Sequence, residues 1–155
     1  MQGYRRTRVV FVCLGNSCRS PMAEAIAAHI ASDVMEVSSA GVAALGRVQS
    51  LTKLTVAKNG YPADGLQSKS LEVSDVEAAD IVINMTGRPG LALCQDGSRV
   101  EDWDVEDPYG SDAETYQRIF EDIESRVVEL VGRVRRSGTS EFTARNAREK
   151  RTSEQ

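Results

Sequence analysis

The sequence predicts a single α/β domain with a four-stranded parallel sheet and helices on both faces. Short runs of β-branched and aromatic residues alternate with stretches in which apolar residues keep helical spacing. One of these runs leads through a tight loop directly into a helix start, which is typical of parallel α/β sheets. Because helices join parallel strands, they pack on both faces of such a sheet.

The first strand and the first helix enclose the most informative loop. Val9–Val12 is a short apolar run that Cys13 ends, and residues 14–18 form the loop. Ser20 and Pro21 favour a helix start, with the serine as N-cap and the proline in the first helical position. The apolar residues that follow at helical spacing are Met22, Ala23, Ile26, Ala27 and Ile30.

Weaker patterns predict the elements in the middle of the chain. The predicted strands are 34–39, 80–85 and 98–103, and the last of them resembles an edge strand. The predicted helices are 50–59, 74–79 and a brief one within 88–94.

The last predicted helix has the strongest pattern. Ser111-Asp112-Ala113-Glu114 is typical of a capping box, and one apolar stripe follows to about Arg136. The stripe consists of Tyr116, Ile119, Phe120, Ile123, Val127, Leu130, Val131 and Val134. Residues 1–136 are therefore predicted to form the domain, and the polar, charged stretch 137–155 is predicted to be a disordered tail.

Residues 13–19 place a thiol and a guanidinium at the two ends of one loop. A loop that leads into a helix N-terminus can aim several backbone N–H groups at one point, which makes an anion site. This positive field favours the thiolate form of Cys13. The planar fork of Arg19 matches two oxygens of a phosphate group. An activated nucleophile inside an oxyanion site predicts covalent phosphoryl transfer.

The run Cys-Leu-Gly-Asn-Ser-Cys-Arg-Ser-Pro-Met-Ala-Glu-Ala, residues 13–25, resembles the low-molecular-weight protein tyrosine phosphatases. The resemblance covers about residues 7–136 and implies a sheet with the strand order 2-1-3-4. It implies that Cys13 attacks phosphorus and that Arg19 holds the phosphate oxygens. No metal and no cofactor are expected. The resemblance also assigns phosphate binding to Leu14, Gly15, Asn16, Ser17, Cys18 and Ser20, with Ser20 bonded to the Cys13 sulfur and Asn16 in a left-handed backbone conformation.

The general acid is expected in a second loop. Asp107-Pro108-Tyr109-Gly110 is a turn signal, and the proline restricts Asp107 to an extended backbone. The resembling phosphatases carry their general acid in an Asp-Pro pair just before the last helix. This resemblance implies that Asp107 protonates the leaving group and that Tyr109 forms an aromatic wall of the cleft.

Two features depart from the family pattern. Many members carry a histidine that braces the loop asparagine, whereas the matching stretch 66–70 has none, so Asn16 must be held otherwise. The stretch 42–45 lacks the aromatic residue that often lines the cleft. We expect His29 to lie away from the loop and Trp103 to lie in the core.

Several alternatives share these residues. Protein-arginine phosphatases of the same fold carry threonine at the position of Ser17, and a serine there does not decide the substrate. A thioredoxin-coupled arsenate reductase needs two further thiols, but Met85 stands at the expected relay position and Cys94 is the single downstream thiol. A phosphate-binding module without catalysis is expected to lack Cys13 or Asp107, and both are present.

Composition narrows the partners. The net charge of −4 argues against nucleic acid, and no apolar run approaches the roughly 20 residues of a membrane span. The 3 cysteines do not make a disulfide framework, which favours a reducing, cytoplasmic setting. Cys18 is expected to form a reversible disulfide with an oxidised Cys13. The expected partners are a phosphorylated protein and phosphate or another oxyanion, and the chain is expected to be a monomer or a weak dimer.

Overall fold

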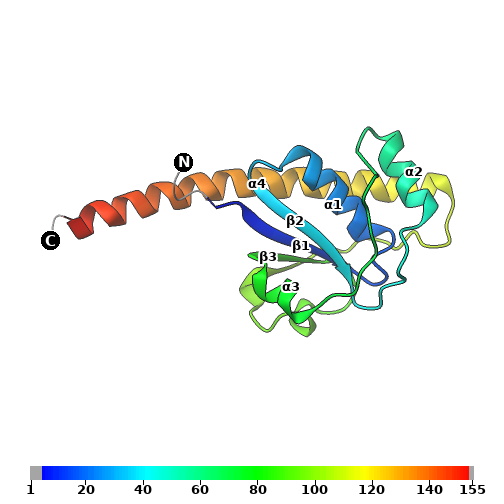
Figure 1. The fold of residues 1–155 in the computed structure, drawn as a ribbon, viewed down its shortest axis with the longest axis horizontal. Coiled ribbons are helices and arrows are strands. Elements are labelled where there is room, and N and C mark those ends of the chain that lie inside the picture. The colour runs from blue at the N-terminus through cyan, green and yellow to red at the C-terminus, as the bar shows by residue number, and fades with distance from the viewer. Residues whose placement is uncertain (1–4, 154–155) are drawn as a thin grey trace.

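Four parallel strands form the sheet at the centre of the molecule, in the order β2-β1-β3-β4 (Figure 1). The computed structural model describes residues 5–153, with side chains up to residue 137. This order and the parallel pairing confirm the predicted sheet. The strands are β1 (Thr7–Cys13), β2 (Met35–Gly41), β3 (Ile81–Asn84) and β4 (Val100–Asp102).

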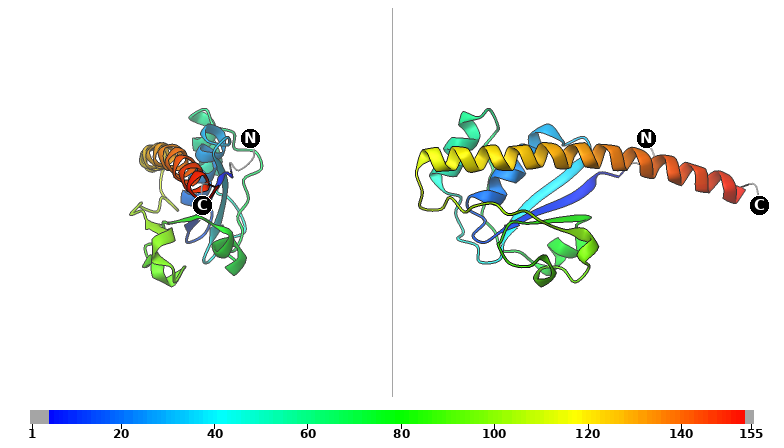
Figure 2. Two further views of the ribbon diagram at one scale, coloured as in Figure 1. Left: turned by 90° about the vertical axis from the view of Figure 1, so that its left-hand side faces the viewer. Right: turned by 180° about the vertical axis from the view of Figure 1, so that it is seen from behind.

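Helices cover both faces of the sheet, as predicted. The long helix α4 packs with α1 and α2 on one face, and α3 lies on the other (Figures 1 and 2). Two short 3-10 helices, Gly90–Ala92 and Gly97–Arg99, precede β4. The α-helices are α1 (Arg19–Ile30), α2 (Ser50–Lys58), α3 (Val73–Ala78) and α4 (Ala113–Ser153).

The alternation of side chains along β1 divides the core into two clusters. Phe11 and Cys13 belong to the larger cluster, between the sheet and the helices α1 and α4. Val10 and Val12 belong to the smaller cluster on the face that α3 covers. The Cys13 side chain therefore leaves the sheet on the side of α1, at the carboxyl end of a central strand, where open α/β sheets bind their ligands.

The helix α1 begins earlier than the sequence predicts. Cys18 is its N-cap, no side chain caps it, and Arg19 is its first residue. Pro21 is therefore in the third helical position, where its missing N–H still costs nothing because no helical partner exists there. Ser20 does not act as the cap because its hydroxyl contacts Asn16 and Cys13 inside the loop.

The helix α4 differs from its prediction at both ends. It begins at Ala113, and Asp112 rather than Ser111 acts as the cap, since its carboxylate accepts the Thr115 N–H at 2.9 Å. It ends at Ser153, not near Arg136. No proline follows Pro108, so nothing in the sequence after the apolar stripe forces the helix to stop. Figure 1 shows this last part of α4 projecting past the sheet. The assignment of 137–155 to a separate tail stays a prediction.

The described part of the chain contains no helix that is both long and apolar enough to span a bilayer. Among the same residues, no group of three or more His, Cys, Asp or Glu side chains is arranged to hold a metal ion.

Candidate active site

The loop between β1 and α1, residues 14–18, turns its carbonyl groups outward. We call it the nucleophile loop. Backbone N–H groups of the β2–α2 connection donate to the carbonyls of residues 13, 14, 15 and 17 at 2.8–3.2 Å. The Thr52 hydroxyl also donates to the carbonyl of Ser17, at 2.9 Å. No backbone N–H of the loop itself donates a bond within the part of the chain that the structure describes. These N–H groups remain available to an anion.

Two residues make the tight turn of this loop feasible. Asn16 has a φ of 48°, the left-handed conformation that the sequence predicts and that asparagine tolerates better than most residues. Gly41 ends β2 directly against the loop. A Cβ at this position would lie 2.8 Å from both the Asn16 nitrogen and the Leu14 carbonyl oxygen, so only glycine fits.

The Asn16 side chain ties the loop to the rest of the domain. Its Nδ2 donates to the hydroxyls of Ser20 at 2.7 Å and Ser39 at 3.0 Å. Its Oδ1 accepts the backbone N–H of Lys69 at 2.8 Å. The segment that lacks the family histidine therefore still braces the asparagine, through its backbone, and Ser39 supplies a second brace.

Cys13 lies at the bottom of the loop and is 2% exposed. Its Sγ is 3.0 Å from the hydroxyl of Ser20, which is the contact that the resemblance implies. Since Ser20 is in the first turn of α1, the start of that helix sets the position of the hydroxyl.

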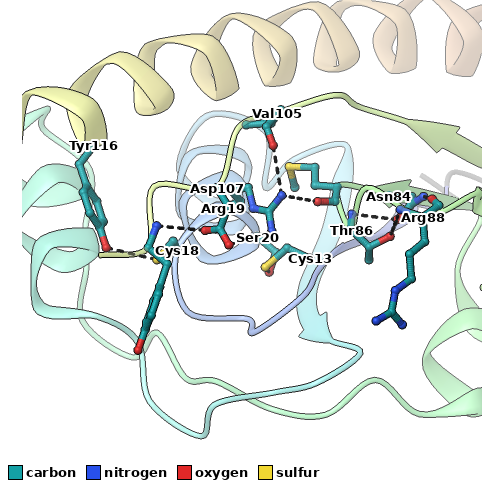
Figure 3. Close-up of polar contacts among 12 residues, drawn as sticks. Cys13, Cys18, Arg19, Ser20, Asn84, Thr86, Arg88, Val105, Asp107 and Tyr116 are labelled. Carbon is teal, nitrogen blue, oxygen red and sulfur yellow. Dashed lines mark hydrogen bonds and ion pairs between the residues drawn. The ribbon is translucent and has the colours of Figure 1, made fainter. Parts of the chain in front are cut away.

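Arg19 is buried beside Cys13, with its guanidinium oriented by two carbonyl groups. Nη1 donates to the carbonyls of Met85 at 2.7 Å and Val105 at 3.1 Å. Nη2 lies 3.5 Å from a carboxylate oxygen of Asp107 (Figure 3). Nε is buried and has no hydrogen-bond partner among the described residues. The Nε–Nη2 edge is therefore the part of the guanidinium that a ligand can use.

Asp107 lies across the pocket from Cys13. Its side chain is 44% exposed, and one oxygen accepts the N–H of Tyr109 at 3.1 Å. Both residues belong to the connection before α4, residues 104–110, which we call the acid loop. The pocket between the two loops has a volume of about 280 Å³. It is lined by Cys13, Leu14, Gly15, Ser17, Cys18, Arg19, Ala43, Leu45, Asp107 and Tyr109.

Ser17 and Cys18 have other contacts than the sequence suggests. Ser17 lines the pocket, as expected, but it is only 2% exposed and its hydroxyl donates to the Arg47 carbonyl at 2.7 Å. The Cys18 sulfur is 3.4 Å from the Tyr116 hydroxyl, and burial raises the pKa of its thiol. Burial also raises the pKa of Tyr116. Cys13 and Cys18 are both free thiols, and a disulfide between them stays a prediction.

The remaining residues singled out in the sequence lie outside the pocket. Trp103 is 5% exposed and packs against Phe11, which confirms its place in the core. His29 contacts Tyr61 edge-on, with ring centroids 5.5 Å apart, away from the nucleophile loop as expected. Cys94 belongs to the core cluster on the other face of the sheet.

Four residues that contribute to the site escape sequence reasoning. The carbonyls of Met85 and Val105 orient Arg19, but a backbone contact leaves no side-chain signature. Leu45 forms an apolar wall of the pocket, in a stretch singled out only for its lack of an aromatic residue. Ser39 holds Asn16 from a buried position in β2, and a polar residue inside a predicted strand was the one available signal.

Comparison with known proteins shows which family the chain belongs to. Residues 8–140 match the family model of low molecular weight phosphotyrosine protein phosphatases. A glutaredoxin arsenate reductase of Synechocystis sp. is 30% identical over 82% of this chain and 98% of its own length. The low molecular weight protein-tyrosine-phosphatase PtpB of Staphylococcus haemolyticus is 30% identical over 83% of this chain and 97% of its own.

Among solved structures, the YwlE arginine phosphatase from Geobacillus stearothermophilus aligns with a TM-score of 0.79 and 26% identity. The alignment covers 86% of this chain and 96% of that one. The relatives belong to one fold family, while their names divide among three activities. The chain belongs to the low molecular weight phosphotyrosine protein phosphatase family.

Proposed function

We propose that this protein is a cysteine-dependent protein phosphatase that hydrolyses phosphotyrosine through a cysteinyl-phosphate intermediate. The observation that carries the proposal is the buried Arg19 guanidinium, whose Nε lacks a partner among the described residues although it lies beside Cys13. A buried donor without an acceptor is costly, and a phosphate oxygen at this place would satisfy it.

In the first step, the Cys13 sulfur attacks phosphorus and an S–P bond forms while the bond from phosphorus to the leaving oxygen breaks. The developing charge on the other phosphate oxygens is held by the nucleophile-loop N–H groups and by the Nε–Nη2 edge of Arg19. Asp107, as a carboxylic acid, gives its proton to the leaving oxygen. Its partial exposure at the pocket rim suits a group that must reach the leaving group.

In the second step, a water molecule attacks phosphorus and the S–P bond breaks, which restores the Cys13 thiolate and releases phosphate. Asp107, now a carboxylate, takes a proton from that water. Arg19 and the backbone N–H groups supply all the positive charge that this sequence of steps requires, so the proposal includes no metal and no cofactor.

The walls of the pocket favour an aromatic substrate. Leu45 and Tyr109 line the entrance and are exposed at 53% and 56%. A phosphotyrosine ring that covers them gains about 25 cal/mol for each Å² of apolar surface buried. The Ser17 hydroxyl gives its hydrogen to the Arg47 carbonyl, so it has no hydrogen left to donate to a substrate.

Phosphoarginine hydrolysis is the second candidate, favoured by the similarity to the arginine phosphatase. Its guanidinium would bring polar N–H groups against Leu45, which offers no acceptor. Arsenate reduction has less support, because Met85 stands where a relay cysteine is expected and Cys94 lies in the core on the other side of the sheet.

The decisive experiment compares three substrates on the purified protein. Turnover of a phosphotyrosine peptide, of a phosphoarginine peptide of matched sequence, and of arsenate with a thiol reductant is measured side by side. We expect the highest kcat/KM for phosphotyrosine, with loss of that activity in Cys13→Ala. A higher kcat/KM for phosphoarginine, or arsenate reduction that depends on Cys94, would overturn the proposal.

A further inference from the structure

A continuous row of polar side chains leads from Cys13 into the interior of the domain. Cys13 contacts Ser20 at 3.0 Å, and Asn16 contacts Ser20 at 2.7 Å and Ser39 at 3.0 Å. The hydroxyl of Ser39 then bonds to the carboxylate of Glu24, on α1. Cys13 is 2% exposed, and the three side chains between it and Glu24 are completely buried, so water does not compete with these bonds.

The direction of every hydrogen in this row follows from one backbone contact. The Lys69 N–H donates to the Asn16 Oδ1, so the amide must turn its Nδ2 toward the two serines. The two Nδ2 hydrogens then occupy an acceptor site on Ser20 and one on Ser39. Each serine is left with its own hydrogen for its other partner. Ser20 therefore donates to the Cys13 sulfur, and Ser39 donates to Glu24.

We propose that Glu24 is a positioning residue for the nucleophile, because its carboxylate accepts the Ser39 hydrogen and thereby holds Asn16 and Ser20 in the orientation that stabilises the Cys13 thiolate. The inference rests on the proposed function for its catalytic meaning. Hydrogen bonds in series strengthen one another, so an ionised acceptor at the far end makes Ser39 a better acceptor for Asn16.

A neutral carboxyl group does not serve equally well. If Glu24 offers its own hydrogen to Ser39, the Ser39 hydrogen has no acceptor in a buried place. Burial raises the pKa of Glu24, while the Ser39 hydrogen bond and the charge of Lys69 lower it. His29, from the same helix, and Asp64, from the connection after α2, line the small cavity beside it. The hydrogen-bonded row therefore depends on both the charge and the position of Glu24.

If the Glu24 carboxylate acted on Cys13 only through its charge, its effect on the thiolate would have the opposite sign. A carboxylate near a thiolate repels it, so removal of Glu24 would favour the thiolate if only Coulomb interaction mattered. The hydrogen-bonded row predicts that removal of Glu24 disfavours the thiolate. The sign of the effect thus separates the two explanations.

The test measures how fast iodoacetamide alkylates Cys13 as a function of pH, with mass spectrometry assigning the modified cysteine. In Glu24→Ala the midpoint of the profile should move up by about 0.5–1 pH unit, as expected for the loss of one hydrogen-bonded support. Glu24→Gln should move it less, because an amide oxygen still accepts the Ser39 hydrogen. Glu77, exposed on α3 over the other face of the sheet, provides the control Glu77→Ala, with an unchanged midpoint.

Ser39→Ala should raise the midpoint as Glu24→Ala does, and the double variant should show no further increase. For an aryl phosphate, kcat should fall several-fold in Glu24→Ala while KM changes less. A midpoint that falls would indicate repulsion through space, and an unchanged midpoint in both Glu24 variants would indicate a packing role; either result would overturn the proposal. Because alkylation needs no phosphorylated substrate, it tests Glu24 even if the proposed phosphatase activity fails.

Discussion

The nucleophile loop and the acid loop face each other across one pocket, yet they are held in different ways. In the nucleophile loop, Asn16, Ser17 and Cys18 are buried, and its carbonyls and side chains bond to β2, to the segment 68–69 and to α2. In the acid loop, the Asp107 side chain is 44% exposed and Tyr109 is 56% exposed. An exposed ion pair between Arg118 and Glu106, at 2.8 Å, links that loop to α4.

Under the proposed function, the two loops correspond to two parts of one reaction. The phosphate group is the same in every substrate, so a site built before binding loses no free energy to rearrangement. The leaving group differs between substrates, and an acid on a less constrained loop can adapt to it. The two parts meet at Arg19, which donates to the buried carbonyl of Val105 and lies 3.5 Å from the carboxylate of Asp107.

The largest expected effect is the loss of the nucleophile. In Cys13→Ser, turnover of an aryl phosphate should fall to background, because a serine hydroxyl at this place has no base to activate it. The cradle of N–H groups and Arg19 is untouched, so phosphate should still bind. Calorimetry with inorganic phosphate checks binding, and substantial turnover in this variant would mean that another residue attacks phosphorus.

The effect of replacing Asp107 in the acid loop should depend on the leaving group. Asp107→Asn should slow the cleavage of phosphotyrosine by about 10²–10⁴-fold, the range of a positioned general acid. The loss should shrink for nitrophenyl esters, whose leaving groups depart without a proton. Measuring kcat across a series of aryl phosphates tests this, and an equal loss across the series would remove the acid role.

Substitution of Asn16 should destabilise the nucleophile loop itself. Asn16→Ala removes three buried hydrogen bonds and puts alanine at a φ of 48°, so the free energy of unfolding should fall by about 2–4 kcal/mol. Asn16→Gly tolerates that backbone and should lose less stability. Urea unfolding of both variants separates the strain from the bonds, and equal stability losses would assign the whole effect to the bonds.

The variant Cys18→Ser tests whether Cys18 protects the Cys13 thiol against irreversible oxidation. Peroxide converts the Cys13 thiolate to a sulfenic acid, and the Cys18 thiol can displace water from it to form a disulfide. After peroxide treatment, a dithiol should restore several-fold more activity to the unmodified protein than to Cys18→Ser. Equal recovery of the two proteins would show that Cys18 does not capture the oxidised Cys13 and only packs against Tyr116.

The smallest effect should come from the exposed side of the acid loop. Arg118→Ala removes the ion pair with Glu106, and an exposed pair of this kind contributes about 0.2–1 kcal/mol. Thermal unfolding at low and high salt checks this, since salt should reduce the difference between the variant and the parent. A stability loss as large as that of Asn16→Ala would show that the two loops are held alike.

The sequence predicted the fold well because its signals are local. Apolar runs mark β1 and β3, the stripe from Tyr116 to Val134 marks α4, and the strand order came with the family resemblance. The helix starts were less accurate. Ser20 and Ser111 both have the chemistry of a cap, but Ser20 is used inside the nucleophile loop, and Asp112 is one residue closer to the helix than Ser111.

The residues of the candidate site were also found from the sequence, but their supports were not. Cys13, Arg19 and Asp107 converge on one pocket although Asp107 is far from the others in the chain. The brace on Asn16 comes from a backbone N–H and from Ser39, and such contacts depend on how β2 and the segment 66–70 pack. The contact between the Ser17 hydroxyl and the Arg47 carbonyl was missed for the same reason, because tertiary structure places that carbonyl.

The direction of the sheet has a practical consequence for handling the protein. All four strands point their carboxyl ends toward the pocket, while the amino end of β1 and the far end of α4 lie at the opposite side (Figure 1). A fluorescent reporter, affinity tag or surface linker fused at either end is thus directed away from the substrate entrance. The molecule can be immobilised or tethered to a chosen target with its pocket facing outward, as a substrate-trapping reagent would require.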